Sequence, residues 1–472
     1  IDDIVVVTFT KAAAADMKEK LYTALSSAAA ENIESRRLSE MSLKIASARI
    51  STISSFCYRF VRENFEQLGL SPRLRMADDG ETKPLLAECL TEEEEAFERD
   101  DGDIVLLADS FGGDKNMNRL DEMLLELYGK FRATPFWKDS YISAIENEKL
   151  KTADCRSGGF FATPAGAEIM DDTLRKLNTL RIRAEKLFEF VEAAATSEKH
   201  IVIIEKMYDD LTELCQRKYD GYSALKSAVT SFSAGRLYNV GMERDAVEHI
   251  THEKNFITAR MNKLAESFAF TEEQIAEDCE KVIRINEAIK SILFALDEKY
   301  TAVKNRRGIC DYSDVEHLTL KLLGKRTPGG IVRTGLCRRY AAGIRELYVD
   351  EYQDVNPLQD MIFSLLSKGN NAFFVGDVKQ SVYRFRNASA RIFGDRVKNA
   401  PDVDSEGDTG KIYLRENFRS SENVVNFVNA VFEKLYTPEN TGYSYENEKL
   451  VFASGVKYPL PAIVTCITDA PS

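Results

Sequence analysis

A chain of 472 residues exceeds the size that one hydrophobic core usually serves, so three or four domains are expected. Its hydrophobic content of 44% and charged content of 29% are ordinary for a globular protein, and no run approaches the roughly 18 apolar residues of a membrane span. Eight cysteines without a C-x-x-C pair argue against zinc or iron–sulfur motifs and fit a reducing cytoplasm. A net charge of −13 excludes a uniformly basic nucleic-acid binder but allows a basic groove.

The first residues predict one part of an α/β domain. Residues 4–8 form a continuous β-branched run, typical of a strand buried in a parallel sheet. A helical pattern follows over 11–25, and residues 49–53 predict a second strand. We assign 1–75 to this part of the domain.

Residues 76–310 change to long helical periodicity without clear strands. The strongest example is an apolar series at spacings of three and four, formed by Ile275, Cys279, Val282, Ile285, Ile289, Leu293, Leu296 and Tyr300. We interpret this stretch as an all-helical insertion into the α/β domain.

The α/β pattern resumes over 311–405, with strands predicted at 347–349 and 372–375. After a linker-like segment, 406–472 predict the start of another α/β domain. The predicted fold is thus a parallel-sheet α/β domain split by the helical insertion and followed by the beginning of a second such domain.

Three short signatures carry the chemistry, and all lie after the helical stretch. They are the acidic run Asp350 to Asp354, the loop sequence Gly376 to Arg386, and Asn417 to Ser420. The first two follow predicted strands, at the edge where open α/β sheets bind ligands. No G-x-x-x-x-G-K-[ST] phosphate loop occurs in the chain.

The pair Asp350 and Glu351 suits nucleoside triphosphate hydrolysis. Such an enzyme needs one carboxylate for Mg²⁺ and a second to orient the attacking water. Neighbouring side chains at a strand end diverge, so Asp350 can face the metal while Glu351 faces the γ-phosphate. The alternative for an isolated Asp-Glu pair is a solvated acidic turn.

These strings resemble the motifs of superfamily 1 helicases of the UvrD/Rep kind. Within that family, four further stretches resemble the AddA (RexA) branch of helicase–nuclease subunits: Thr52 to Cys57, Arg73 to Asp78, Leu127 to Phe131, and Asp311 to His317. The resemblance implies RecA-like motor domains that use ATP and Mg²⁺ to move 3′ to 5′ on single-stranded DNA. It also implies double-strand-break processing on double-stranded DNA, a nuclease domain, a cytoplasmic location and a heterodimer with an AddB/RexB-like subunit.

The resemblance assigns roles at the nucleotide site. It implies that Asp350 binds Mg²⁺, Glu351 activates water, Gln380 senses the γ-phosphate and Arg419 reaches that phosphate from the second motor domain. An Arg guanidinium is a fixed, planar cation suited to phosphate oxygens, which agrees with that role. For Arg419 the alternative is a surface salt bridge.

A second set of residues is expected to contact DNA. It consists of Thr8, Phe9, Thr10, Tyr383, Phe385 and Arg386. Aromatic faces stack on bases with little regard to sequence, which a translocating motor requires. The alternative for the aromatic residues is core packing. The chain departs from the usual family pattern at two positions, with Phe385 where Trp is common and Ser54 where His is common.

Two other interpretations stay open at this point. One is a UvrD/Rep/PcrA-like repair helicase without a nuclease, and the other is a catalytically dead DNA-binding scaffold that has lost its phosphate loop. Because the chain starts at Ile1 in a buried strand, we expect an internal fragment that alone hydrolyses ATP negligibly.

Overall fold

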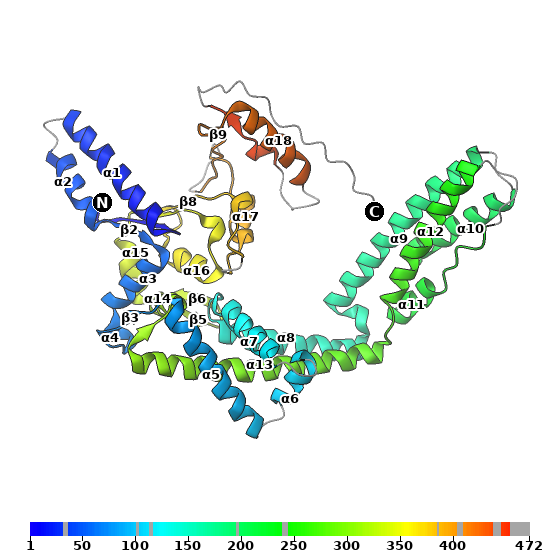
Figure 1. The fold of residues 1–472 in the computed structure, drawn as a ribbon, viewed down its shortest axis with the longest axis horizontal. Coiled ribbons are helices and arrows are strands. Elements are labelled where there is room, and N and C mark those ends of the chain that lie inside the picture. Colours follow the sequence, from blue (N-terminus) through cyan, green and yellow to red (C-terminus); the bar gives the residue numbers. More distant parts are fainter. Residues whose placement is uncertain are drawn as a thin grey trace. The chain divides into compact units, whose positions relative to one another are not determined.

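The computed structural model describes residues 1–31, 36–100, 103–112, 117–194, 198–237, 244–384, 387–403, 409–437 and 445–453. It divides into two compact units (Figure 1). The sheet unit comprises Ile1–Glu63 and Glu316–Ser472, and the helical unit comprises Asn64–Val315. The predicted mixture of a parallel sheet with a long helical stretch is confirmed.

The sheet unit is built on four parallel strands in the order β2-β1-β7-β8. Their bounds are β1 (Ile4–Thr8), β2 (Arg49–Thr52), β7 (Glu346–Val349) and β8 (Ala372–Phe374). In register, Val7 lies opposite Val349, which lies opposite Phe374. Val7 and Val349 are completely buried, as expected for a sheet covered by helices. The parallel pairing brings the carboxyl ends of β1, β7 and β8 to one edge.

Helices and short strands complete the sheet unit. They are α1 (Lys11–Glu31), α2 (Arg36–Lys44), η1 (Ile45–Ser47), α3 (Ile53–Glu63), most of α14 (Tyr312–Leu323), β5 (Gly324–Thr327), β6 (Gly330–Arg333), α15 (Gly335–Ala342), η4 (Tyr352–Asp354), α16 (Pro357–Leu366), η5 (Val378–Gln380), α17 (Ala390–Asn399), β9 (Glu416–Asn417), α18 (Glu422–Leu435), η7 (Glu446–Glu448) and β10 (Val451–Phe452). The start of α16 is encoded locally, because Asn356 and Gln359 form a capping box around Pro357.

The helical unit contains the predicted helical stretch, but the expectation that residues 76–310 are all-helical is corrected, because two short strands at its ends pair in parallel. Its elements are α4 (Phe65–Leu68), β3 (Arg75–Met76), α5 (Asp79–Asp100), α6 (Asp103–Leu107), η2 (Ala108–Gly112), α7 (Met117–Arg132), α8 (Trp137–Gly158), η3 (Phe160–Ala162), α9 (Pro164–Ala193), α10 (Glu198–Gln216), α11 (Tyr222–Thr230), α12 (Arg244–Glu266), α13 (Glu272–Arg307) and β4 (Ile309–Cys310). Figure 1 shows α13 as the long helix against which α5, α7 and α8 pack, with α9, α10 and α12 side by side.

The long helix α13 follows directly from its sequence. A capping box between Thr271 and Gln274 begins it, and Gly308 ends it at a φ of 66°. Much of the predicted apolar series is buried in the cluster shared with α5 to α8, including Ile289. Val282 is a correction to that series, because its side chain is 52% exposed. Among the described residues, no helix is long and apolar enough to cross a membrane.

A buried ionic network joins α13 to the residues that follow it. The Lys304 ammonium lies 2.6 Å from carboxylate oxygens of both Asp311 and Asp314. The Arg132 guanidinium lies 2.8 Å from Asp314 and 3.0 Å from Asp297. Lys304 is only 1% exposed, so these charges depend on one another for stabilisation.

Candidate functional site

The predicted acidic pair lies immediately after β7, at the carboxyl edge of the sheet. The amide of Asp350 donates to the carbonyl of Val7 in β1, a distance of 3.0 Å, which ties this end of the strand to its neighbour. Glu351 has a φ of 52°, in the left-handed region that side chains rarely adopt. This turn leaves Asp350 half-buried and Glu351 exposed. The two neighbouring acidic residues therefore differ in their exposure to water.

The surroundings of Asp350 suit a cation. Burial raises the pKa of its carboxyl above the ordinary value, and the charge of Glu351 adds to that effect. No Lys or Arg forms an ion pair with Asp350 in the described part of the chain. Mg²⁺ prefers oxygen ligands and usually keeps several waters beside one or two carboxylates. The donor set fits such an ion, although the described residues contain no cluster of three metal-binding side chains.

Gln353 connects the acidic run to the loop after β8. Its side chain is 1% exposed and donates to a carboxylate oxygen of Glu351 at 2.7 Å. Its side-chain oxygen accepts the backbone N–H of Asp377 at 2.9 Å. Gln353 lies within the acidic run but is not among the site residues predicted from the sequence. The available signal was that it is the one amide side chain in an otherwise acidic and aromatic turn.

Gly376 allows this connection because it has no side chain. A Cβ atom there would lie 2.6 Å from the Gln353 side-chain oxygen and 3.0 Å from the ring of Phe393. Gly376 therefore lets the loop after β8 approach the acidic run closely enough for the Gln353 hydrogen bond.

The loop after β8 holds Gln380 through Asp377. The Gln380 side chain donates to one oxygen of Asp377 at 2.9 Å, and the Lys379 ammonium lies 2.8 Å from the other. Burial raises the pKa of Asp377, but the Lys379 and Gln380 hydrogen bonds outweigh it and bring the net pKa below the ordinary value. Gln380 is exposed, and its amide is directed by a carboxylate that stays ionised.

Two of the predicted DNA-contacting aromatic residues stack on each other. The rings of Phe9, just after β1, and Tyr383, just after η5, have centroids 4.8 Å apart and an interplanar angle of 29°. Both side chains are half-buried, so each retains some exposed ring surface. The structure thus brings the ends of two predicted motifs together at the same edge as Asp350.

The remaining predicted DNA contacts have different surroundings. Thr8 is completely buried, and its hydroxyl has no hydrogen-bond partner in the described part of the chain. The Thr10 hydroxyl accepts the backbone N–H of Ala13 at 3.1 Å, which caps the start of α1. Phe385 and Arg386 lie outside the described residues.

Arg419 follows the short strand β9, in the third of the predicted signatures. Its side chain is exposed, and its backbone N–H donates to the Asn417 side chain at 3.0 Å. Asn417 also accepts the backbone N–H of Ser420 at 2.8 Å, which shapes this turn. Among the described residues, no ion pair or hydrogen bond joins the Arg419 guanidinium to Asp350, Glu351 or Gln380.

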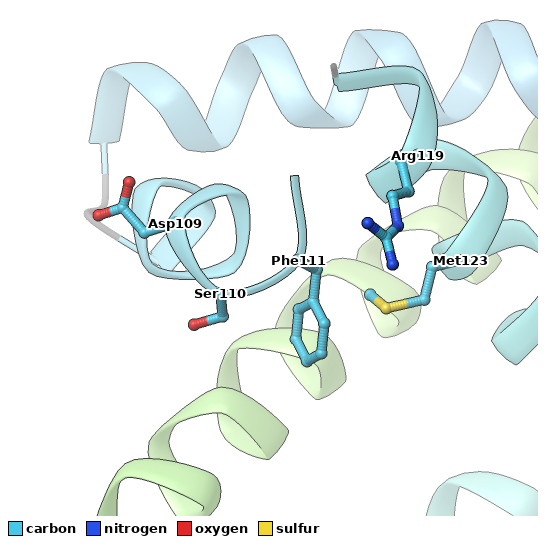
Figure 2. Close-up of a pocket in the computed structure, with 5 residues that line it drawn as sticks. All are labelled: Asp109, Ser110, Phe111, Arg119 and Met123. Atoms are coloured by element: carbon cyan, nitrogen blue, oxygen red, sulfur yellow. The ribbon is translucent and has the colours of Figure 1, made fainter. Parts of the chain in front are cut away.

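A separate pocket occurs in the helical unit, between η2 and α7. Figure 2 shows its lining, with the Arg119 guanidinium and the Met123 side chain near the ring of Phe111. Asp109 and Ser110 complete the lining. None of the predicted site residues contributes to this pocket.

Comparison with known proteins places the motifs in a family. The family described as UvrD/REP helicase N-terminal domain matches residues 1–401. The A subunit of the ATP-dependent helicase/nuclease of Thermoanaerobacter pseudethanolicus is 32% identical, over 98% of this chain and 38% of that protein. The protein of the same name from Clostridioides difficile is 31% identical, over 95% of this chain and 36% of that protein. The chain thus spans little more than a third of the length of these relatives. It belongs to the UvrD/REP helicase family.

Proposed function

We propose that this chain is the ATP-driven motor portion of an AddA-like helicase–nuclease subunit. The observation that carries the proposal is the continuous set of hydrogen bonds from Glu351 through Gln353 and Asp377 to Gln380. The same loop continues within three residues to Tyr383, which stacks on Phe9. A nucleotide-sensing residue and a base-stacking residue on one short loop suit the coupling of ATP hydrolysis to movement on DNA.

The proposed architecture has two motor domains. Residues 1–75 and 311–405 would form a first RecA-like domain, interrupted by the helical insertion at 76–310, and 406–472 would begin the second. The parallel order of β2, β1, β7 and β8 supports the first assignment, because its carboxyl edge carries the acidic run. The parallel pairing of β9 with β10 beside α18 agrees with the second assignment.

The residues at the sheet edge have distinct proposed roles in ATP hydrolysis. Asp350 would hold Mg²⁺, which when bound neutralises charge on the phosphate oxygens. Glu351 orients the attacking water and accepts its proton, and Gln353 keeps the Glu351 carboxylate in place. Gln380 contacts the γ-phosphate, and Arg419 approaches it from the second domain when the domains close. The phosphate-binding loop itself would come from a longer protein, as the length of the relatives suggests.

Movement on DNA would follow from the shared loop. A change in the contacts of Gln380 shifts a backbone that reaches Tyr383 three residues later, so the Phe9–Tyr383 pair opens or closes on a base. Repetition would move the protein 3′ to 5′ along single-stranded DNA during double-strand-break processing in the cytoplasm. A nuclease domain and an AddB/RexB-like partner belong to the same proposal, because the relatives are named helicase/nuclease subunits.

The decisive experiment uses the longer protein that contains this chain, with its partner. We expect single-stranded DNA to stimulate ATP hydrolysis, and unwinding to require ATP and a 3′ single-stranded tail. Degradation of the unwound strands would support the helicase–nuclease assignment, whereas unwinding without degradation would favour a UvrD/Rep-like helicase. DNA binding without any ATP hydrolysis would overturn the motor proposal and favour a scaffold.

A further inference from the structure

The side chain of Lys379 links the Gln380 loop to the last part of the sheet unit. Its ammonium pairs with Asp377 at 2.8 Å and also with the carboxylate of Glu448 in η7. It lies 5.8 Å from the ring centroid of Tyr445, which adds a cation–π contact. The side chains of Lys379 and Glu448 are 14% and 22% exposed, so water screens this pair only partly.

Glu448 is held in place by α18. The Asn429 side-chain oxygen accepts hydrogen bonds from the Tyr445 hydroxyl at 2.7 Å and from the backbone N–H of Leu450 at 3.0 Å. The Asn429 amide donates to the Leu450 carbonyl at 2.8 Å. These bonds fix the chain on both sides of Glu448, and Asn429 is itself buried. The position of the Glu448 carboxylate, and with it the ion pair with Lys379, therefore depends on the position of α18.

Asp377 connects Lys379 to Gln380. One of its oxygens binds Lys379 and the other accepts the Gln380 side chain. Burial lowers the pKa of Lys379, but the hydrogen bonds from Lys379 to Asp377 and Glu448 raise it to a net value above the ordinary one. Lys379 thus remains a cation that pairs with two carboxylates, Asp377 in its own loop and Glu448 in η7.

We propose that Glu448 is a positioning residue that acts through Lys379 and Asp377 to orient Gln380. The position of α18 would then determine how strongly the Gln380 side chain binds a γ-phosphate. This inference rests on the proposed function, because it takes Gln380 as the residue that distinguishes ATP from ADP. Glu448 lies outside all three signatures and touches no reacting atom in this assignment.

The test compares nucleotide affinities of the longer protein with Glu448 and with Glu448→Gln. A non-hydrolysable ATP analogue and ADP serve as probes. We expect the variant to lose about fivefold in affinity for the analogue, near the upper end for a partly exposed ion pair, with ADP affinity nearly unchanged. A merely structural role would lower both affinities together.

Two further variants make the result specific. Glu433→Gln is the matched control, because it removes an ion pair between α18 and Lys449 and leaves the Lys379–Glu448 pair with both of its charges. Lys379→Met should reproduce the loss for the analogue, and the double variant with Glu448→Gln should be no worse than Lys379→Met alone. Equal behaviour of Glu448→Gln and Glu433→Gln, or additive losses in the double variant, would overturn the inference. Absence of DNA-stimulated hydrolysis in the unsubstituted protein would instead overturn the proposed function.

Discussion

The side chain of Gln353 donates a hydrogen bond of 2.7 Å to the carboxylate of Glu351, two residues earlier in the chain. Glu351 is otherwise exposed and sits in a left-handed turn. A carboxylate that orients water needs a fixed direction, and a buried amide provides one. The orientation of Glu351 therefore depends on a residue whose own position is fixed by the loop after β8 through Asp377.

Replacing Gln353 with Ala should lower both stability and turnover. The variant removes the donor to Glu351 and leaves the Asp377 N–H without its acceptor, which costs about 1 to 3 kcal/mol for a buried group. Thermal unfolding of the chain measures the first effect, and kcat for ATP in the longer protein measures the second. Gln67→Ala, at an exposed position on α4, is the control. An unchanged kcat in a folded Gln353→Ala protein would separate Gln353 from the chemistry.

Glu351→Gln should stop turnover while single-stranded DNA binding persists. The amide cannot accept a proton from water, and loss of a general base typically lowers the rate by about 100- to 10,000-fold. DNA binding depends on other residues, so the affinity for an oligonucleotide should stay close to that of the unsubstituted protein. Steady-state ATP hydrolysis and fluorescence anisotropy measure the two quantities. Normal hydrolysis by this variant would remove Glu351 from its proposed role.

Gly376→Ala tests the close approach between the acidic run and the loop after β8. The new Cβ would lie 2.6 Å from the Gln353 side-chain oxygen, so either Gln353 or the loop must shift. We expect lower kcat for ATP in the longer protein and a lower unfolding temperature. Gly343→Ala is the matched control, because its Cβ would meet only an ordinary contact at 3.5 Å. If both variants behave alike, the proximity at Gly376 is not needed for turnover.

The strands and the positions of the acidic residues could be predicted because both are local properties. A β-branched run such as Ile4–Thr8 predicts a strand in the interior of a sheet. An acidic residue directly after a predicted strand, such as Asp350, is expected at the carboxyl edge of that sheet. The linkage of Glu351 to Asp377 could not be predicted, since it depends on a left-handed turn and on how β7 pairs with β8. The contact between Lys379 and Glu448 likewise depends on the path of the chain and not on spacing.

In the helical stretch, too, contacts between residues far apart in the chain could not be predicted from the sequence. Its periodicity predicted buried positions on α13, yet Val282 is exposed because burial also requires a packing partner at that turn. From the sequence alone, the stretch Asp311 to His317 indicates only a family resemblance. In the structure, Asp311 and Asp314 are partners of the buried Lys304. A residue pattern of this kind does not say which distant cation it will meet.

The stacked pair Phe9 and Tyr383 should act as one unit in DNA binding. Loss of a base-stacking ring costs about 1 to 3 kcal/mol in affinity for single-stranded DNA, so Tyr383→Ala should weaken binding by that amount. Because the two rings touch, the double variant with Phe9→Ala should lose less than the sum of the single losses. Tyr22→Ala, at an exposed aromatic position on α1, is the control. If Tyr383→Ala bound single-stranded DNA with unchanged affinity, the two rings would contribute to packing and not to DNA binding.

Lys304→Met should destabilise the helical unit at neutral pH and do so less in acid. Removing the buried ammonium leaves the half-buried Asp311 and Asp314 beside one cation, Arg132, and breaking a buried pair in this way costs about 3 to 5 kcal/mol. Burial raises the pKa of Asp314, but Arg132 and Lys304 outweigh it and hold the net pKa below the ordinary value.

The sign of the pH effect follows from that lowered pKa. A carboxyl whose folded pKa is depressed stabilises the protein above its unfolded pKa, and the stabilisation is lost as the pH falls through the folded pKa. The destabilisation by Lys304→Met should therefore be largest near pH 7 and shrink toward and below about pH 4, where an unfolded Asp takes up its proton. Urea unfolding at the two pH values, with hydrogen exchange of α13 to locate the effect, measures this. Lys281→Met, at an exposed position on α13, controls for loss of a charge. A pH-independent difference would show that Lys304 stabilises the unit by packing rather than by its charge.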